Sequence, residues 1–268
     1  MRISVDHHTR YRFSKPQDRL VQMLRLTPQD SVDQTVVTWH IGVDCDARLR
    51  EARDGFGNRV TMLYADGPLD GIEITVQGEV LTAGDAGIVH GAVEPLPAEL
   101  YLRRGGRTDP SADLLEFAGD HAGRDPLDTL HRFCRGLHER VGVIEKHHDD
   151  GLDAGQVFAT TEAAPRDFAH MMIALGHAAG IPGRYVSGYL RNPDGAAHAP
   201  HAWMEAHVAG LGWVAFDAAR GICADRNYVR VAVALDAAGA APVAGLRIGS
   251  GREMLDVDVQ VEDMGGDA

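Results

Sequence analysis

Residues 160–180 read TTEAAPRDFAHMMIALGHAAG, and the rest of the chain is organised around this stretch. Its apolar side chains recur at helical spacing on one face, and most of the other side is apolar too, which is typical of a buried helix. The side chains of residues 160–162 can cap its start, and Pro165 suits the first turn because its φ angle is already helical. Gly180 and Pro182 would end it. The sequence therefore predicts one central helix here.

Three segments after this helix alternate apolar and polar residues, as half-buried strands do. They are residues 184–190 (RYVSGYL), 201–208 (HAWMEAHV) and 213–217 (WVAFD). A hairpin folded about Ala209 would place His201 directly opposite Asp217. A carboxylate in that position can fix the tautomer of a histidine. We therefore predict a His–Asp contact between these two strands.

The helix and the strands together resemble the core of bacterial transglutaminase-like proteins, a family of the papain-like cysteine protease superfamily. The resemblance rests on PRDFAHMMIALGHAAGIPGRYVSGYL, HAWMEAHVAGLGWVAFD and YVRVAVALD. The family uses a Cys-His-Asp triad, so the resemblance implies that His201 is the catalytic histidine and Asp217 the aspartate. The usual family run before DFAH is glycine, valine, cysteine, then arginine or glutamine. The cysteine position of that run falls on Pro165.

A proline at the nucleophile position changes the expected chemistry more than the expected fold. A helix N-terminus lowers the pKa of a thiol, and a backbone N–H there can stabilise an oxyanion. Pro165 removes both the sulfur and the N–H, yet it still begins a helix well. Two further departures agree: Ala163 replaces the family's glycine, and Ala218, Ala219 and Arg220 replace its Pro-Thr-Asn. The resemblance thus implies a degenerate triad.

Four more residues are candidates to line the implied cleft. Arg166 and Asp167 directly follow the nucleophile position. Trp203 and Glu205 share a face of their predicted strand with His201, because side chains alternate along a strand. Glu205 is in addition a candidate acid.

Three functions remain open at this point. The first is a catalytically silent protein, a pseudoenzyme whose cleft binds a peptide, an amine or a protein partner. The second is an amide, peptide or ester hydrolase in which His201 and Asp217 activate water without a covalent step. The third is a purely structural subunit, since a His and an Asp on neighbouring strands also occur as a structural hydrogen bond.

The composition limits the class of protein, its partners and its cellular compartment. The chain has 268 residues, of which 44% are hydrophobic and 24% charged, as in ordinary globular proteins. A net charge of −13 argues against binding to nucleic acid or to anionic membrane surfaces. No apolar run approaches a membrane helix, and the first residues, MRISVDHHTRYRF, lack an apolar signal segment. We therefore expect a cytoplasmic bacterial protein, with no prediction of its oligomeric state.

The fold class expected from these patterns is α+β, with a β-domain before the core. Residues 1–90 should form an N-terminal all-β domain, and YRFSKP, MLRLTPQ and DGFGNRV resemble the family's N-terminal region. Its expected strands are residues 2–13, 21–26, 34–43, 59–64 and 72–81. Residues 91–124 should form a connecting region between this domain and the core, with a short helix at 112–118. Residues 125–268 should form the transglutaminase-like core, a central helix packed on an antiparallel sheet.

No metal or cofactor is expected. His147 and His148 are adjacent but lack further ligands at a defined spacing. Cys45, Cys134 and Cys223 are an odd set without metal spacing, and we interpret them as reduced thiols. Cys134 should be a small buried side chain, whereas a displaced thiol nucleophile at Cys223 stays an alternative.

Overall fold

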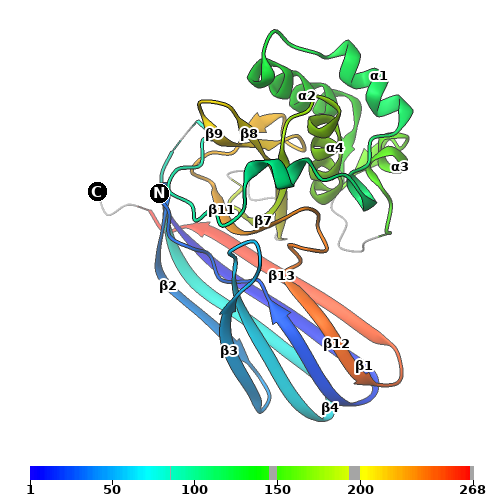
Figure 1. Cartoon of the computed structure of the whole chain (residues 1–268). Helices are drawn as coiled ribbons and strands as arrows, with labels where there is room; N and C mark the ends of the chain where they lie inside the picture. Colours follow the sequence, from blue (N-terminus) through cyan, green and yellow to red (C-terminus); the bar gives the residue numbers. More distant parts are fainter. Residues whose placement is uncertain (85, 145–149, 193–199, 266–268) are drawn as a thin grey trace.

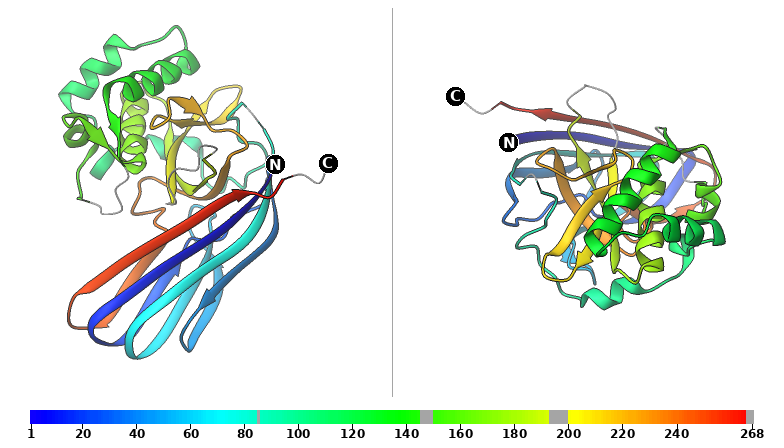
Figure 2. Two further views of the ribbon diagram at one scale, coloured as in Figure 1. Left: turned by 180° about the vertical axis from the view of Figure 1, so that it is seen from behind. Right: turned by 90° about the horizontal axis from the view of Figure 1, so that it is seen from above.

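The structure is a computed structural model that describes all residues except 85, 145–149, 193–199 and 266–268. Long strands at one end of the molecule extend away from a part that holds all the helices (Figures 1 and 2). In chain order the elements are β1 (Arg2–Leu24), β2 (Gln34–Val43), β3 (Ala47–Arg53), β4 (Arg59–Thr82), α1 (Ala112–Asp120), α2 (Pro126–Arg140), β5 (Gly142–Val143), α3 (Ala154–Phe158), β6 (Glu162–Ala163), α4 (Pro165–Ala178), β7 (Gly183–Leu190), β8 (His201–Val208), β9 (Gly212–Asp217), β10 (Ile222–Cys223), β11 (Tyr228–Ala234), β12 (Val243–Gly249) and β13 (Glu253–Asp263). Two short 3₁₀ helices, Ala98–Leu102 and Gly106–Thr108, precede α1. The predicted α+β class is confirmed.

The N-terminal sheet is built on two long antiparallel strands, β1 and β4. β2 and β3 pair with the free side of β4, while β12 and β13 pair with the free side of β1. A register irregularity between Arg12 and Arg19 changes which side chains of β1 face inward, from odd-numbered residues such as Ile3 to even-numbered ones such as Leu20. Apolar side chains from both halves of β1 then meet in one core.

Two expected pairs of short strands are continuous in the structure. Residues 2–13 and 21–26 lie mostly within β1, and residues 59–64 and 72–81 lie within β4. β3 was not predicted, because almost all of its side chains are exposed and its sequence, ARLREAR, shows no apolar alternation. A strand of this kind is specified by its partner β4 and not by its own pattern.

The C-terminal strands correct the expected domain boundary. β12 and β13 were placed in the core range 125–268, but both pair with β1 of the N-terminal sheet. The pattern of residues 253–263 does predict a strand, since valines alternate with polar residues. Alternation specifies the two faces of a strand and leaves open which sheet it joins.

The core contains a five-stranded antiparallel sheet in the order β10-β9-β8-β7-β11, with α4 packed on one face. α4 is buried along its length, as predicted, and its inward residues include Phe168, Met172 and Leu175. No helix within the described ranges is long and apolar enough to span a membrane. α4 contacts β7, β8 and β9, so helix and sheet form one unit (Figure 1).

Pro165 lies in the first turn of α4 and Gly180 follows its end, both as predicted, but the capping of its start differs from the prediction. The helix begins at Pro165, and the predicted capping by residues 160–162 is wrong, because Thr160 Oγ1 donates to carbonyls of Val157 and Glu162 instead. The Asp167 carboxylate accepts from the backbone N–H of Ala164 at 3.3 Å and caps this end. At the other end Gly180 adopts φ 71°, the left-handed conformation predicted for the stop.

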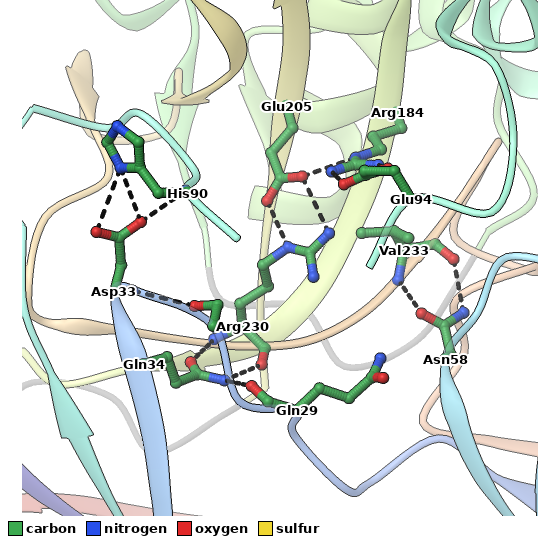
Figure 3. Close-up of polar contacts among 11 residues, drawn as sticks. Gln29, Asp33, Gln34, Asn58, His90, Glu94, Arg184, Glu205, Arg230 and Val233 are labelled. Carbon is green, nitrogen blue, oxygen red and sulfur yellow. Dashed lines mark hydrogen bonds and ion pairs between the residues drawn. The ribbon is translucent and has the colours of Figure 1, made fainter. Parts of the chain in front are cut away.

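Amide side chains from the N-terminal part of the chain cover the free edge of β11, an edge strand of the core sheet (Figure 3). Gln34 exchanges two hydrogen bonds with the backbone of Arg230, at 2.8 and 2.9 Å. Asn58 exchanges two with the backbone of Val233, both at 2.8 Å. An apolar cluster containing Val80 and other side chains from both sheets lies beside them. These contacts satisfy an edge that would otherwise be open and fix the two sheets together.

Candidate functional site

His201 and Asp217 meet as predicted. His201 lies at the start of β8 and Asp217 at the end of β9. Because the two strands are antiparallel, these two strand termini lie at the same end of the sheet. Nε2 of His201 lies 2.7 Å from Oδ2 of Asp217. The His201 side chain is 10% exposed and that of Asp217 is 1% exposed. Among the described residues, Nδ1 of His201 makes no hydrogen bond, so this nitrogen is the one available for chemistry or binding.

The register of the β8–β9 hairpin differs from the predicted one. Met204 pairs with Phe216 and Val208 with Gly212, so residues 209–211 form the loop and His201 is not directly opposite Asp217. Gly212 at φ 83° allows this longer loop. The register is displaced by two residues, which keeps every side chain on its predicted face. The two side chains therefore still meet, diagonally across the strands.

Tyr228 completes this polar group, and the sequence analysis missed it. Its O–H donates to Oδ2 of Asp217 at 2.7 Å, and the backbone N–H of Ala219 donates to Oδ1 at 3.0 Å. Burial would raise the pKa of Asp217, but the charge and hydrogen bond of His201 and the hydrogen bond of Tyr228 hold it below its ordinary value. Burial and the nearby carboxylate raise the pKa of Tyr228. Only its place at the start of a predicted strand marked Tyr228 in the sequence.

Trp203 packs beside these residues and does not present an open surface. It is 2% exposed, and its ring lies edge-on to Tyr228, with centroids 5.3 Å apart. A side chain at Gly188 on β7 would come within 2.8 Å of the indole, so the glycine makes room for it. The indole N–H has no acceptor in the described parts of the chain. Trp203 thus supports Tyr228 from within the fold.

Glu205 lies in a buried ion-pair group, which corrects its predicted role as an acid (Figure 3). It has no exposed surface, and its carboxylate accepts from Nε of Arg184 and Nε of Arg230, both at 2.7 Å. Arg184 also binds Glu94 and stacks over Trp213 at 3.8 Å. Burial would raise the pKa of Glu205, but the two arginines more than offset this and lower it. Glu205 is a structural anion with both oxygens in use.

At the start of α4 the two polar candidates contact each other. Arg166 Nε lies 3.2 Å from Asp167 Oδ1, and both residues are half-buried. Ala163 and Ala164, immediately before Pro165, are 3% and 2% exposed. The described start of the helix therefore offers a proline ring and an internally paired arginine, with no sulfur atom.

Two family models match this chain. Residues 3–81 match the bacterial transglutaminase-like N-terminal region, and residues 117–218 match the transglutaminase-like superfamily. Together the two matches cover more than half of the sequence and fall on the two parts of the fold. The chain belongs to the transglutaminase-like superfamily.

Two relatives are similar to this chain over nearly the whole of both sequences. An uncharacterized protein of Mycobacterium leprae is 26% identical over 280 residues, covering 97% of this chain and 98% of its own. An uncharacterized protein of Mycobacterium tuberculosis is 26% identical over 297 residues, covering 100% of this chain and 94% of its own. A crystal structure of "a Putative Cysteine Protease from Cytophaga hutchinsonii" superposes with a TM-score of 0.79 at 21% identity, covering 100% of this chain and 92% of that one. At that identity the likeness concerns the fold alone.

None of the three cysteines of this transglutaminase-like chain belongs to α4. Cys134 is 2% exposed on α2, as predicted for a small buried side chain, and burial raises its pKa. Cys223 is half-buried on β10, and burial raises its pKa too. Cys45 lies in the N-terminal part, between β2 and β3. The histidines considered for a metal, His147 and His148, fall outside the described residues.

Proposed function

We propose that this protein is a catalytically silent transglutaminase-like protein whose cleft beside His201 binds a peptide without forming a covalent bond to it. The observation that carries the proposal is that α4 begins with Pro165 while His201 and Asp217 stay hydrogen-bonded. We take Pro165 to occupy the position of the family's nucleophile. Proline offers neither a thiol nor a backbone N–H. The covalent part of the family's chemistry therefore has no group to perform it.

The retained polar group suits a binding role. Asp217 holds the His201 ring through Nε2, and Tyr228 and the Ala219 N–H in turn hold Asp217. The ring is thereby fixed with Nδ1 free to hydrogen-bond an amide of a ligand. A preorganised side chain loses little conformational freedom when a ligand binds, which favours affinity.

The test is peptide binding measured together with turnover. A blocked, fluorescently labelled glutamine-containing peptide is titrated into the parent protein and into His201→Ala, while ammonia release is monitored in parallel. We expect the parent to bind without releasing ammonia, and His201→Ala to bind about tenfold more weakly, the loss of one hydrogen bond. His40→Ala, an exposed histidine of the N-terminal sheet, is the matched control and should bind as the parent does. Equal binding by His201→Ala would overturn the proposal.

A second function is favoured by the geometry of the same pair. A histidine held 2.7 Å from a buried carboxylate is the arrangement of a general base, which could activate water for amide or ester hydrolysis. That reading predicts slow hydrolysis by the parent that iodoacetamide leaves unchanged and that Asp217→Asn abolishes. Hydrolysis with this pattern would show that the protein is a hydrolase. Its absence would support the proposal of a catalytically silent protein.

A further inference from the structure

Arg220 is an unusual arginine in this fold. It is half-buried in the loop between β9 and β10, and among the described residues its guanidinium makes no hydrogen bond or ion pair. Every other buried or half-buried arginine in the described ranges has a partner. A guanidinium carries five donors in a planar fork, and none of the Arg220 side-chain nitrogens is buried, so a ligand can reach them.

The position of Arg220 links it to the site around His201. Its backbone N–H donates to the carbonyl of Asp217 at 3.2 Å, so it sits one turn beyond the carboxylate that holds the histidine. Burial acts to raise the pKa of Asp217, and Arg220 acts to lower it, in addition to the larger effects of His201 and Tyr228. The guanidinium is therefore close enough for its charge to act on the carboxylate, although the two do not form an ion pair.

The local carboxylates are already engaged. Oδ2 of Asp217 accepts from His201 and Tyr228, and Oδ1 accepts from Ala219. The carboxylate of Asp225, also near Tyr228, accepts from the backbone and side chain of Asn227. In the described structure the Arg220 fork thus contacts no acceptor, while a carboxylate from outside would match its planar geometry.

We propose that Arg220 binds a carboxylate group of the ligand that occupies the site beside His201. This inference rests on the proposed peptide-binding function and deepens it, because it assigns an acidic group to the peptide. The carboxylate could belong to the C-terminus of the peptide or to an aspartate or glutamate side chain.

The first experiment tests Arg220 without requiring a peptide. Arginine Nε–Hε resonances of ¹⁵N-labelled protein are followed by NMR during titration with sodium acetate, with sodium chloride at equal ionic strength as the reference. The resonance of Arg220 is assigned as the one that is absent from Arg220→Gln and present in Arg135→Gln. We expect this resonance to shift and saturate with acetate and not with chloride. Arg135 is an exposed arginine of α2 and serves as the matched control. An Arg220 resonance that responds to acetate no more than to chloride would overturn the inference.

The second experiment separates the two sources of the carboxylate and separates this inference from the function on which it rests. Three glutamine peptides with a blocked N-terminus are compared. The first has a free C-terminus, the second has a C-terminal amide, and the third has a C-terminal amide and a glutamate side chain. We expect a carboxylate peptide to bind the parent about tenfold tighter than the neutral amide, and Arg220→Gln to bind all three alike. Arg220→Lys should recover part of the preference, and thermal unfolding should show that each variant is folded.

The outcomes are distinguishable. Binding that depends on His201 but shows no preference for a carboxylate would leave the proposed function standing and overturn the role of Arg220. A saturable response of Arg220 to acetate, with peptide binding that is insensitive to His201→Ala, would support the role of Arg220 in carboxylate binding and overturn the peptide function.

Discussion

Pro165 is the residue on which the proposed loss of covalent chemistry depends. It begins α4 and needs no backbone donor there, so it suits the first turn of the helix. We expect Pro165→Cys not to restore transglutaminase or protease activity of family strength, because the buried Ala163 and Ala164 differ from the family's glycine and valine. An orientation error of about 1 Å can cost roughly a hundredfold in rate. The assay is ammonia release and amine incorporation with a glutamine-containing peptide.

Pro165→Ala is the matched control, because it returns the N–H without a thiol. Both variants should unfold within about 1 kcal/mol of the parent, since proline at a helix start mainly restricts the unfolded chain. Robust turnover by Pro165→Cys would show that the cleft still has catalytic shape. Robust turnover by the parent would overturn the proposal that the protein is catalytically silent.

The three thiols should be unreactive at neutral pH. Burial raises the pKa of Cys134 and Cys223, and burial together with Asp44 and Asp46 raises that of Cys45, so little thiolate is present. We expect no fast, stoichiometric labelling by iodoacetamide at pH 7 in mass spectrometry. Protein unfolded in guanidinium should label at all three positions, which controls for the reagent. Fast labelling of Cys223 in the folded protein would revive a displaced nucleophile.

At the scale of elements, Glu205 joins β7, β8 and β11 through Arg184 and Arg230. Glu205→Gln keeps the size of the side chain but leaves two arginines without their shared anion. We expect it to lower the free energy of unfolding by about 3–5 kcal/mol, the usual cost of breaking a buried pair. The measurement is urea denaturation followed by circular dichroism.

Glu79→Gln is the matched control for that change. Glu79 pairs with Arg2 on the surface of the N-terminal sheet, where both side chains are partly exposed. Its loss should cost no more than about 1 kcal/mol. Equal effects of the two substitutions would mean that the buried group contributes nothing beyond a surface ion pair.

At the scale of the whole molecule, His7 links the two sheets and should make stability depend on pH. It is 2% exposed on β1, and its Nδ1 lies 2.9 Å from the hydroxyl of Tyr189 on β7. Burial, with a smaller effect of His8, lowers the pKa of His7 to about 4. Because the unfolded chain binds this proton near pH 6.5, stability should fall as the pH drops from about 6.5 to about 4, by up to roughly 3 kcal/mol.

The measurement is the free energy of unfolding between pH 4 and pH 7 for the parent, His7→Gln and His40→Gln. His40 is exposed and serves as the control. His7→Gln should reduce proton uptake on unfolding near pH 5 by about one proton, whatever its effect on stability at pH 7. An unchanged slope in His7→Gln would show that His7 titrates alike in the folded and unfolded states.

Much of the fold could be predicted because local patterns specify it. The apolar spacing of residues 165–178 and the left-handed stop at Gly180 are properties of one segment, and both are confirmed. The same holds for the alternation of β7, β8 and β9, which placed His201 and Asp217 on matching faces. The register was wrong by two residues, yet an even displacement preserves the faces, so the contact survived the error.

The sequence by itself determined the α+β class, the central helix and the His201–Asp217 contact. Only the tertiary structure decided that β13 pairs with β1, that Tyr228 holds Asp217 and that Glu205 is neutralised by two arginines. Each of these joins residues distant in the chain; Ile3, for example, pairs with Asp263. Periodicity records which side of a segment is buried. The partner is set by how whole sheets pack, and neither segment's own pattern carries that information.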